Sequence, residues 1–500
     1  MFTGSVPPRW EPLLHVVVIG AGLAGCEAAW QAARRGLDVT LVEMKPGEHS
    51  PAHTSDAFAE LVCSNSLRSN RLANAVGLLK EEMRRLDSLV IAAADESAVP
   101  AGQALAVDRD LFARRITETL AAHPRVTVRQ ARVDRIPDER PVVLATGPLT
   151  AGGLAEDLQR VLGEEYLYFY DALSPIVYAD SIDMEVAFRA SRYDDGPGDY
   201  LNLPLDRARY EAFVAALRAA DTVPLHPFEA ALYFEGCLPV EEMARRGRDT
   251  LAYGPMKPVG LVDPRTGRRP HTVVQLRQED KQGALYSLVG FQTKLRVGEQ
   301  KRIFRTLPGA EQAVFARYGS VHRNTYLNAP RHLGPTLELH GRPGVYVAGQ
   351  IAGVEGYVES AALGGLAGIQ VAFAQRGRVA PRPDPATAHG ALLEFLSSAE
   401  PHRFSPMNVN FGLFPPLTGP ARGSRADRHE RLAQRALAAI ECYATLVTCE
   451  QGGRRESADA QRAQVSRSEP KASEDHQVGE RRPEPERERT ASAKARQERA

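Results

Sequence analysis

Long apolar runs and paired cysteines are both scarce in this chain of 500 residues. No stretch approaches the roughly 18 consecutive apolar residues of a membrane-spanning helix, and the N-terminal segment lacks the charged start and apolar core of a signal peptide. The five cysteines, at positions 26, 63, 237, 442 and 449, form no CxxC pair and no disulfide-dense framework. We therefore expect a cytoplasmic protein without membrane association, and exclude the class of disulfide-stabilised secreted domains.

A charge excess of either sign is also absent, because 62 lysines and arginines balance 62 aspartates and glutamates. A nucleic-acid partner would have to be bound by local basic patches rather than by a global field. Residues 451–500 contain twelve Lys/Arg, ten Asp/Glu and no aromatic, leucine or isoleucine residue. Such a segment cannot bury enough apolar surface to offset the entropy lost on ordering, which predicts a disordered charged tail. A solvated extension is favoured over a dedicated RNA-binding tail.

A glycine-rich fingerprint lies between the first predicted strand, 15–20, and a predicted helix that runs to about residue 35. Its residues are Gly20, Ala21, Gly22, Leu23, Ala24 and Gly25, the GxGxxG pattern of dinucleotide-binding βαβ units. The helix N-terminus offers amide donors to a pyrophosphate, and Glu43, at the end of the next predicted strand, would accept hydrogen bonds from a ribose. The alternative is an ordinary glycine turn in an α/β core.

Two later turns favour FAD over NAD as the dinucleotide. A predicted strand at 141–148 ends in Thr146 and Gly147, and another at 344–350 leads through Gly349, Glu355 and Gly356 into a helix of small residues. These turns resemble the further cofactor contacts of two-part FAD domains. The predicted fold is α/β: a two-part Rossmann-like FAD-binding domain, 12–185 and 335–450, with an inserted smaller α/β domain, 186–334, and a disordered C-terminal tail, 451–500.

Two cysteines lie in polar, turn-rich segments. Cys63 precedes Ser64 and Asn65, which are natural N-caps for a helix expected to follow, with Arg68 and Arg71 in its first turns. A helix N-terminus and nearby guanidiniums favour the thiolate form of a cysteine, and the thiolate is the nucleophile. Cys237 follows a glycine on a predicted exposed turn. Free cysteines are usually small buried hydrophobes, so a core role is the alternative for each.

The other candidate residues are weaker. Cys26, Cys442 and Cys449 are interpreted as core residues, and no His/Cys cluster has zinc-ligand spacing, so no metal is predicted. Two groups of polar residues are candidate substrate contacts: Lys294 and Arg296 in the densest basic stretch, and His322, Arg323 and Asn324 before the chain returns to the FAD domain. Solvated surface is the favoured alternative for the basic stretch, and contact with RNA phosphates is the functional one.

Many segments, in order from about residue 14 to about 445, resemble the folate- and FAD-dependent tRNA (uracil-5-)-methyltransferase (TrmFO) family. The most specific are GAGLAGCEAAW (20–30), FAELVCSNSLRSNRL (58–72), VPAGQALAVDR (99–109), YFYDALSPIV (168–177), YFEGCLPVEEMARRG (233–247) and AGQIAGVEGYVESAA (348–362). The resemblance implies transfer of the methylene of 5,10-methylenetetrahydrofolate to C5 of uridine 54 in the T loop of tRNA. FAD is the implied cofactor, and NADH or NADPH the implied reductant.

The same resemblance implies that Cys63 and Cys237 share the nucleophilic and proton-transfer roles, with Cys63 favoured to engage the flavin-borne carbon or the uracil. It also implies that the uridine is extruded from its stack, and no obligate protein partner is expected. One alternative is the related FAD and folate enzyme that modifies the wobble uridine with a GTPase partner, which is typically longer and has a helical C-terminal domain. Another is a flavin-containing RNA-binding protein without turnover, whose function would survive loss of both thiols.

Overall fold

The computed structural model describes residues 14–150, 152–163, 167–192, 196, 198–224, 233, 235–418 and 424–448. The predicted tail at 451–500 lies outside the described residues. The first sheet is parallel and has the strand order β16 (Val345–Val347), β7 (Val142–Leu144), β1 (His15–Ile19), β2 (Asp38–Glu43), β6 (Val126–Gln130). All residues of the central strand after His15 are buried, as expected for a parallel strand covered on both faces. The predicted mixed α/β fold with a Rossmann-like parallel sheet is therefore confirmed.

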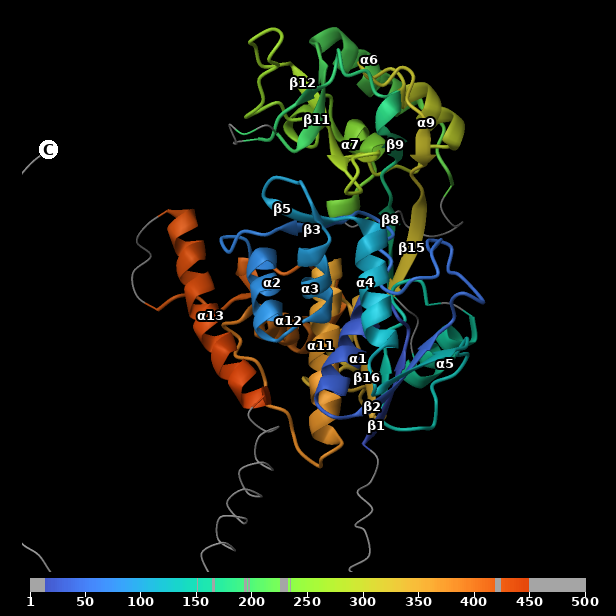
Figure 1. The fold of residues 1–500 in the computed structure, drawn as a ribbon, viewed down its shortest axis with the longest axis vertical. Helices are drawn as coiled ribbons and strands as arrows, with labels where there is room; N and C mark the ends of the chain where they lie inside the picture. The colour runs from blue at the N-terminus through green and yellow to red at the C-terminus, as the bar shows by residue number, and fades with distance from the viewer. Residues whose placement is uncertain are drawn as a thin grey trace, which may run out of the picture. The chain divides into compact units, whose positions relative to one another are not determined.

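Two helices of small residues pack closely beside this sheet. These are α1 (Leu23–Arg34) and α11 (Tyr357–Ala374), which lie side by side in Figure 1. A Cβ at Gly364 would lie 2.0 Å from the carbonyl oxygen of Ala24, and one at Gly368 would lie 2.4 Å from that of Ala28, so only glycine permits this approach. By length and composition α11 could span a membrane, but 83% of it is buried inside the protein, as in the core helix of a globular domain.

Further helices and a small sheet surround this part. The helices are α2 (Ala75–Arg85), α3 (Leu89–Glu96), α4 (Arg109–Ala121), α5 (Gly152–Leu162), α10 (Ala329–His332), α12 (Ala388–Ser398) and α13 (Arg425–Thr448). The sheet has the order β3 (Ser66–Ser69), β5 (Ala104–Val107), β4 (Ala98–Val99). Cys26 is fully buried in α1, as predicted, whereas the prediction of a core role for Cys442 is wrong, because its side chain is exposed on α13. Cys449 lies outside the described residues.

The prediction of a helix directly after Cys63 is wrong. The chain instead forms β3, which pairs antiparallel with β5, and the next helix, α2, begins only at Ala75. Pairing with a strand far along the chain thus overrides the local N-cap pattern of Ser64 and Asn65. Arg68, expected in the first helical turn, has a φ of +61° and forms an ion pair with the buried Glu359.

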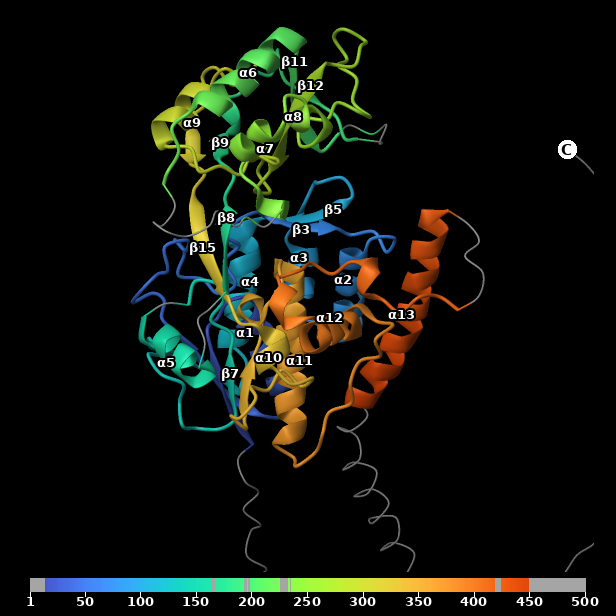
Figure 2. The same ribbon diagram turned by 180° about the vertical axis from the view of Figure 1, so that it is seen from behind.

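The second large sheet is antiparallel and has its own apolar core. Its order is β10 (Phe188–Arg189), β11 (Tyr200–Leu205), β12 (Thr272–Gln278), β13 (Leu285–Leu288), β9 (Ile176–Tyr178), β14 (Phe315–Arg317). Around it lie α6 (Arg207–Ala219), α7 (Val240–Arg246), α8 (Thr250–Tyr253) and α9 (Val297–Phe304). The antiparallel pair β8 (Leu167–Ala172) and β15 (Val321–Tyr326) runs between the two sheets, as Figures 1 and 2 show from opposite sides. The proposed domain boundaries stay a prediction.

Candidate functional site

The glycine-rich loop between β1 and α1 leaves open space at one position only. Gly20 has a φ of +96°, and a Cβ there would lie 2.6 Å from the carbonyl oxygen of Ala145. A Cβ at Gly25 would lie 1.7 Å from the carbonyl oxygen of Gly20, so α1 packs against the loop through this residue. Gly22, the N-cap of α1, is exposed, and a Cβ there would have no neighbour within 4 Å. The loop therefore offers free backbone beside the start of a helix, which suits a phosphate.

The other predicted cofactor residues surround this loop. The carboxylate of Glu43 accepts hydrogen bonds from the amides of Ala21 at 2.6 Å and Lys45 at 3.1 Å. Thr146 and Gly147 follow β7, and Gly349 follows β16, where its Cβ would lie 2.8 Å from that of Ala24. The predicted residues thus gather at the carboxyl ends of neighbouring parallel strands, the usual place for ligands in such folds.

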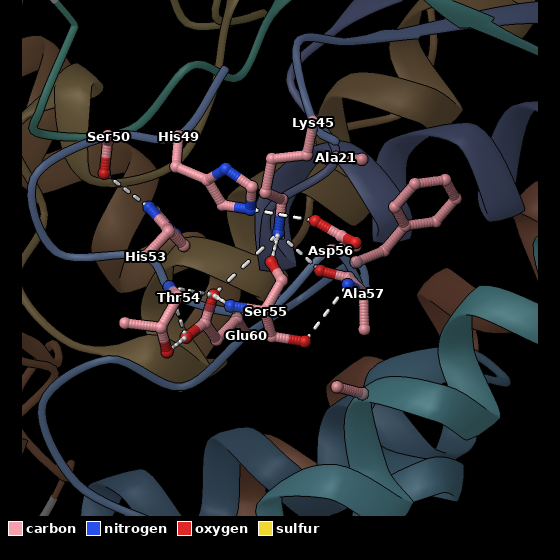
Figure 3. A network of polar contacts seen from close by, with 12 residues as sticks. Ala21, Lys45, His49, Ser50, His53, Thr54, Ser55, Asp56, Ala57 and Glu60 are labelled. Carbon is pink, nitrogen blue, oxygen red and sulfur yellow. Dashed lines mark hydrogen bonds and ion pairs between the residues drawn. The ribbon is translucent and has the colours of Figure 1, made fainter. Parts of the chain in front are cut away.

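Lys45 cross-links the loop of residues 46–60, which contacts the glycine-rich loop through Ala59 (Figure 3). The ammonium group of Lys45 donates hydrogen bonds to the carbonyl oxygens of Ser55, at 3.2 Å, and Ala57, and lies 4.0 Å from the carboxylate of Glu60. Glu60 in turn accepts hydrogen bonds from the amides of Thr54 and Ser55 at 3.1 Å. The amide of Ala59 then donates to the carbonyl oxygen of Ala21 at 2.9 Å. Sequence reasoning missed this anchoring, because the contacts go mostly to backbone carbonyls.

The two thiols meet, together with a carboxylate that sequence reasoning missed. The sulfur atoms of Cys63 and Cys237 and a carboxylate oxygen of Asp171 all lie within 4.8 Å of one another. Cys63 precedes β3, Asp171 lies on β8 and Cys237 ends a short 3₁₀ turn, so three separate segments build this thiol cluster. A hydrogen bond with Cys63, burial and the charge of Asp171 raise the pKa of the Cys237 thiol well above its usual value. Cys237 is therefore protonated at neutral pH.

Asp171 is a half-buried acid with spare hydrogen-bonding capacity. Burial raises the pKa of its carboxyl to about 6, opposed by hydrogen bonds from Cys237, the Ala172 amide and Asn324. Its Oδ1 atom is buried and has no hydrogen-bond partner among the described residues. Burial and the charge of Asp171 also raise the pKa of Glu355, whose carboxylate accepts a hydrogen bond from Gln350 at 2.6 Å. A carboxyl that titrates near neutrality beside a thiol suits proton transfer.

Three arginines hold the segment that carries Cys63, and we call them the arginine clamp: Arg109, Arg277 and Arg317. Arg109 donates to the carbonyl oxygen of Leu61 at 2.5 Å, and Arg317 donates to that of Val62 at 3.1 Å. Arg277 donates to the side chains of Ser64 at 2.7 Å and Asn65 at 2.8 Å. Arg109 lies at the start of α4, Arg277 on β12 and Arg317 on β14, so the clamp draws on three distant elements.

The clamp supplies the positive charge that sequence analysis assigned to other arginines. Arg68 is paired with Glu359, and Arg71 donates to Gln103 at 3.3 Å. Glu279 forms ion pairs with two of these arginines: its carboxylate lies 2.6 Å from Arg109 and 3.8 Å from Arg277. The hydroxyl oxygen of Tyr357 completes the segment's contacts by accepting the Cys63 amide at 2.6 Å and the Ser64 amide at 3.2 Å. Of these missed residues, only those in the family-like segments, such as Arg109 and Tyr357, carried any sequence signal.

The structure separates the candidate substrate residues into two groups. His322 lies opposite Asp171 in the β8–β15 pairing and 3.0 Å from the Ser320 hydroxyl, and Asn324 bonds to Asp171. The guanidinium of Arg323 lies 4.4 Å from the ring centroid of Tyr168. Lys294 is buried and forms an ion pair with Glu242 at 2.8 Å, so the interpretation of this residue as solvated surface is wrong. A phosphate could bind Lys294 only by breaking this ion pair. Arg296 is exposed before α9.

The distances within the thiol cluster would also allow its three residues to bind a cation. A closed zinc site takes four ligands, and the group found among the described residues has three members. The expectation of no metal therefore stays a prediction.

Comparison with known proteins shows the family to which the chain belongs. Residues 15–378 match the family model described as glucose inhibited division protein A. The chain is 57% identical over 430 residues to the methylenetetrahydrofolate–tRNA-(uracil-5-)-methyltransferase TrmFO of Heliobacterium modesticaldum, covering 86% of this chain and 98% of that one. It is 57% identical over 433 residues to the TrmFO of Geobacter sulfurreducens, covering 86% of this chain and 99% of that one. The solved structure of Aquifex aeolicus GidA shares the fold, with a TM-score of 0.63, 16% identity, and coverage of 91% of this chain and 78% of that one.

Proposed function

Because the chain belongs to the glucose inhibited division protein A family, and to its TrmFO methyltransferases, we propose that it forms 5-methyluridine in tRNA from 5,10-methylenetetrahydrofolate. We assign the reaction to uridine 54 of the T loop, with FAD as cofactor and NADH or NADPH as reductant, in the cytoplasm. The carrying observation is that Cys63, Cys237 and Asp171 converge within 4.8 Å. Neither a generic flavin oxidoreductase nor a non-catalytic RNA-binding protein requires two adjacent thiols and a carboxylate.

The residues around the glycine-rich loop fit FAD. The open space at Gly22 and the first amides of α1 would receive the pyrophosphate, and Glu43 would accept hydrogen bonds from the ribose. The turns after β7 and β16 would line the rest of the cofactor. When bound, the flavin supplies the electrons that reduce the transferred one-carbon unit to a methyl group.

We assign to the thiols the activation of the uracil ring. C5 of uracil is a poor nucleophile until a thiolate adds to C6, which forms a sulfur–carbon bond and moves an electron pair into the ring as an enolate. We assign the thiolate to Cys63, because the clamp surrounds it with positive charge and Cys237 retains its proton. The proton at C5 must leave after the carbon is transferred, and we assign its acceptance to Asp171, which lies beside Cys237.

The test uses the purified chain alone, with FAD, labelled methylenetetrahydrofolate, NADH or NADPH, and tRNA lacking the T-loop methyl group. Label at position 54 is the expected result, located by nuclease digestion and mass spectrometry. Label at the wobble position would instead identify the related wobble-modifying activity. A flavin-containing protein that binds tRNA without incorporating label would refute the methyltransferase proposal.

Asp171→Asn removes the proposed base while keeping the size of the side chain. We expect kcat to fall by about a hundredfold or more, as for loss of a general base. In the wild type, kcat should fall as the pH drops through about 6, because the carboxyl becomes protonated there. The variant should lack this acidic limb. Asp180→Asn, at an exposed aspartate, is the matched control; an unchanged acidic limb in Asp171→Asn would assign that titration to another group.

Lys45→Met tests the anchoring of the 46–60 loop. The variant loses two hydrogen bonds to backbone carbonyls, so we expect faster cleavage of the loop by protease and about tenfold weaker FAD binding. Lys281→Met is the control, since Lys281 is exposed and donates to one backbone carbonyl, that of Glu96, at 3.0 Å. Equal protease resistance in both variants would show that Lys45 does not hold the loop.

A further inference from the structure

Two members of the arginine clamp have N–H groups without an acceptor. The Nε and Nη2 atoms of Arg317 are buried and lack a hydrogen-bond partner among the described residues, and so does Nη2 of Arg109. In a guanidinium, Nε–H and Nη2–H point the same way and form the edge that binds a carboxylate or phosphate with two parallel hydrogen bonds. The opposite side of Arg317 is already occupied, because Nη1 donates to Val62. Arg317 therefore has a two-pronged donor edge near Cys63 that has no acceptor among the described residues.

The charge around this edge favours an anionic ligand. The three guanidiniums lie around the carboxylate of Glu279, which pairs with Arg109 and Arg277. The pKa of Tyr357 is raised by burial, so its hydroxyl stays neutral. With the proposed thiolate of Cys63 counted beside Glu279, the three positive charges of the clamp still exceed the negative ones. A buried charged donor without an acceptor is costly, so binding of an anion at this edge is favourable.

Chemistry narrows the choice of anion among the proposed reactants. The pyrophosphate of FAD belongs at the start of α1, on the glycine-rich loop. The glutamate carboxylates of a folate lie at the far end of that molecule, separated from its one-carbon unit by the aminobenzoyl group. In a pyrimidine nucleotide, by contrast, C6 is the base carbon nearest to the nucleotide's own 5′-phosphate. A thiol that attacks C6 therefore brings this phosphate close to itself.

We propose that the unoccupied donors of Arg317 and Arg109 bind the 5′-phosphate of the uridine that the thiols act on. This inference rests on the proposed function, and it names the phosphate of the RNA that the site binds. It moves the expected phosphate contact away from the stretch containing Lys294, which is tied to Glu242. It also couples recognition to reactivity, because the same arginines hold the carbonyls of Leu61 and Val62 next to Cys63.

The experiment is a double-substitution cycle on the flavin-loaded protein and full-length tRNA. One substitution is Arg317→Gln, and the other is a methylphosphonate, which is uncharged, at the phosphate on the 5′ side of the uridine that the wild type methylates. We expect each alone to weaken tRNA binding about tenfold, and the two together to weaken it no further. Arg317→Gln should also lower the dependence of log Kd on log salt by about one unit, and leave the KM for the folate unchanged.

Controls separate this contact from a structural effect on the Cys63 segment. Arg115→Gln, at an exposed arginine of α4, should bind both tRNAs like the wild type. Arg317→Lys keeps the charge without the parallel edge and should give an intermediate loss that preserves the salt dependence. If Arg317→Gln does not fold, the same cycle is run with Arg317→Lys.

Three results would overturn the proposal. Losses that multiply in the double substitution would show that Arg317 and this phosphate do not meet. A loss in kcat alone, with normal tRNA binding, would assign the edge to an oxygen of the uracil ring. A raised KM for the folate would assign it to a folate carboxylate. Failure of the wild type to methylate tRNA would refute the proposed function instead, before the cycle is begun.

Discussion

Cys63→Ser and Cys237→Ser are each expected to lose methyl transfer to tRNA by about a thousandfold or more while retaining bound flavin and a normal melting temperature. A serine hydroxyl at Cys63 is not ionised near neutral pH and is a far weaker nucleophile than a thiolate. At Cys237 the change removes the S–H group that bonds to Cys63 and to Asp171. Initial rates with labelled methylenetetrahydrofolate measure both effects. Cys442→Ser, at the exposed cysteine of α13, is the control and should match the wild type.

The division of work between the two thiols has its own measurement. In tRNA containing 5-fluorouridine, fluorine replaces the hydrogen that must leave C5, so the bond between the attacking sulfur and C6 persists. We expect a covalent protein–RNA complex with the wild type and none with Cys63→Ser. A complex formed by Cys63→Ser but not by Cys237→Ser would reverse the assigned roles. Full activity in either serine variant would remove that thiol from the reaction altogether.

The cofactor cradle could be predicted from sequence because its residues are local. Gly20, Gly22 and Gly25 lie in one short segment, flanked by a strand and a helix whose hydrophobic patterns are regular, and β1 and α1 form as expected. Glu43 was found from its position at the end of the next strand, and its carboxylate does reach the amide of Ala21.

The thiol cluster was only half predictable. Both cysteines stood out by their polar surroundings, but the expected cause of reactivity at Cys63 was wrong, since a strand follows it instead of a helix. The positive charge comes from the arginine clamp, whose members are 46 or more positions away along the chain and carry no shared motif. Asp171 likewise occupies a strand without distinctive spacing. Such partners are selected by β-sheet pairing and packing over long separations, which local sequence patterns do not record.

For Lys294, the local sequence pattern predicted an exposed residue where the structure has a buried one. Its segment is rich in Lys and Arg, which favours solvated surface or phosphate contact. In the folded chain the preceding turn brings Lys294 against Glu242 and within 5.5 Å of the ring centroid of Tyr233, and the side chain is buried. One residue of a charge run can therefore belong to the core, and burial has to be known before it is counted toward a binding patch.

Gly22→Ala and Gly25→Ala should separate cofactor binding from folding. A methyl group at Gly25 would lie 1.7 Å from the carbonyl oxygen of Gly20, so α1 must move away from the loop, and we expect a loss of about 1–3 kcal/mol in unfolding free energy together with loss of flavin. At Gly22 the φ of −74° suits alanine and a methyl group meets no protein atom within 4 Å, so the fold should be unaffected. The methyl group would instead occupy the space assigned to the pyrophosphate.

We therefore expect Gly22→Ala to melt like the wild type and bind FAD at least about tenfold more weakly, measured by flavin fluorescence on titration. Gly298→Ala, at a helical glycine of α9 with open space around it, should change neither property. Normal FAD affinity in Gly22→Ala would show that the phosphates do not approach this residue, and would contradict the assignment of the loop. A melting temperature lowered equally in Gly22→Ala and Gly25→Ala would show that the loop is sterically closed at both positions. Only the expected pattern, with stability lost at one glycine and flavin affinity lost at both, identifies the start of α1 as the pyrophosphate site.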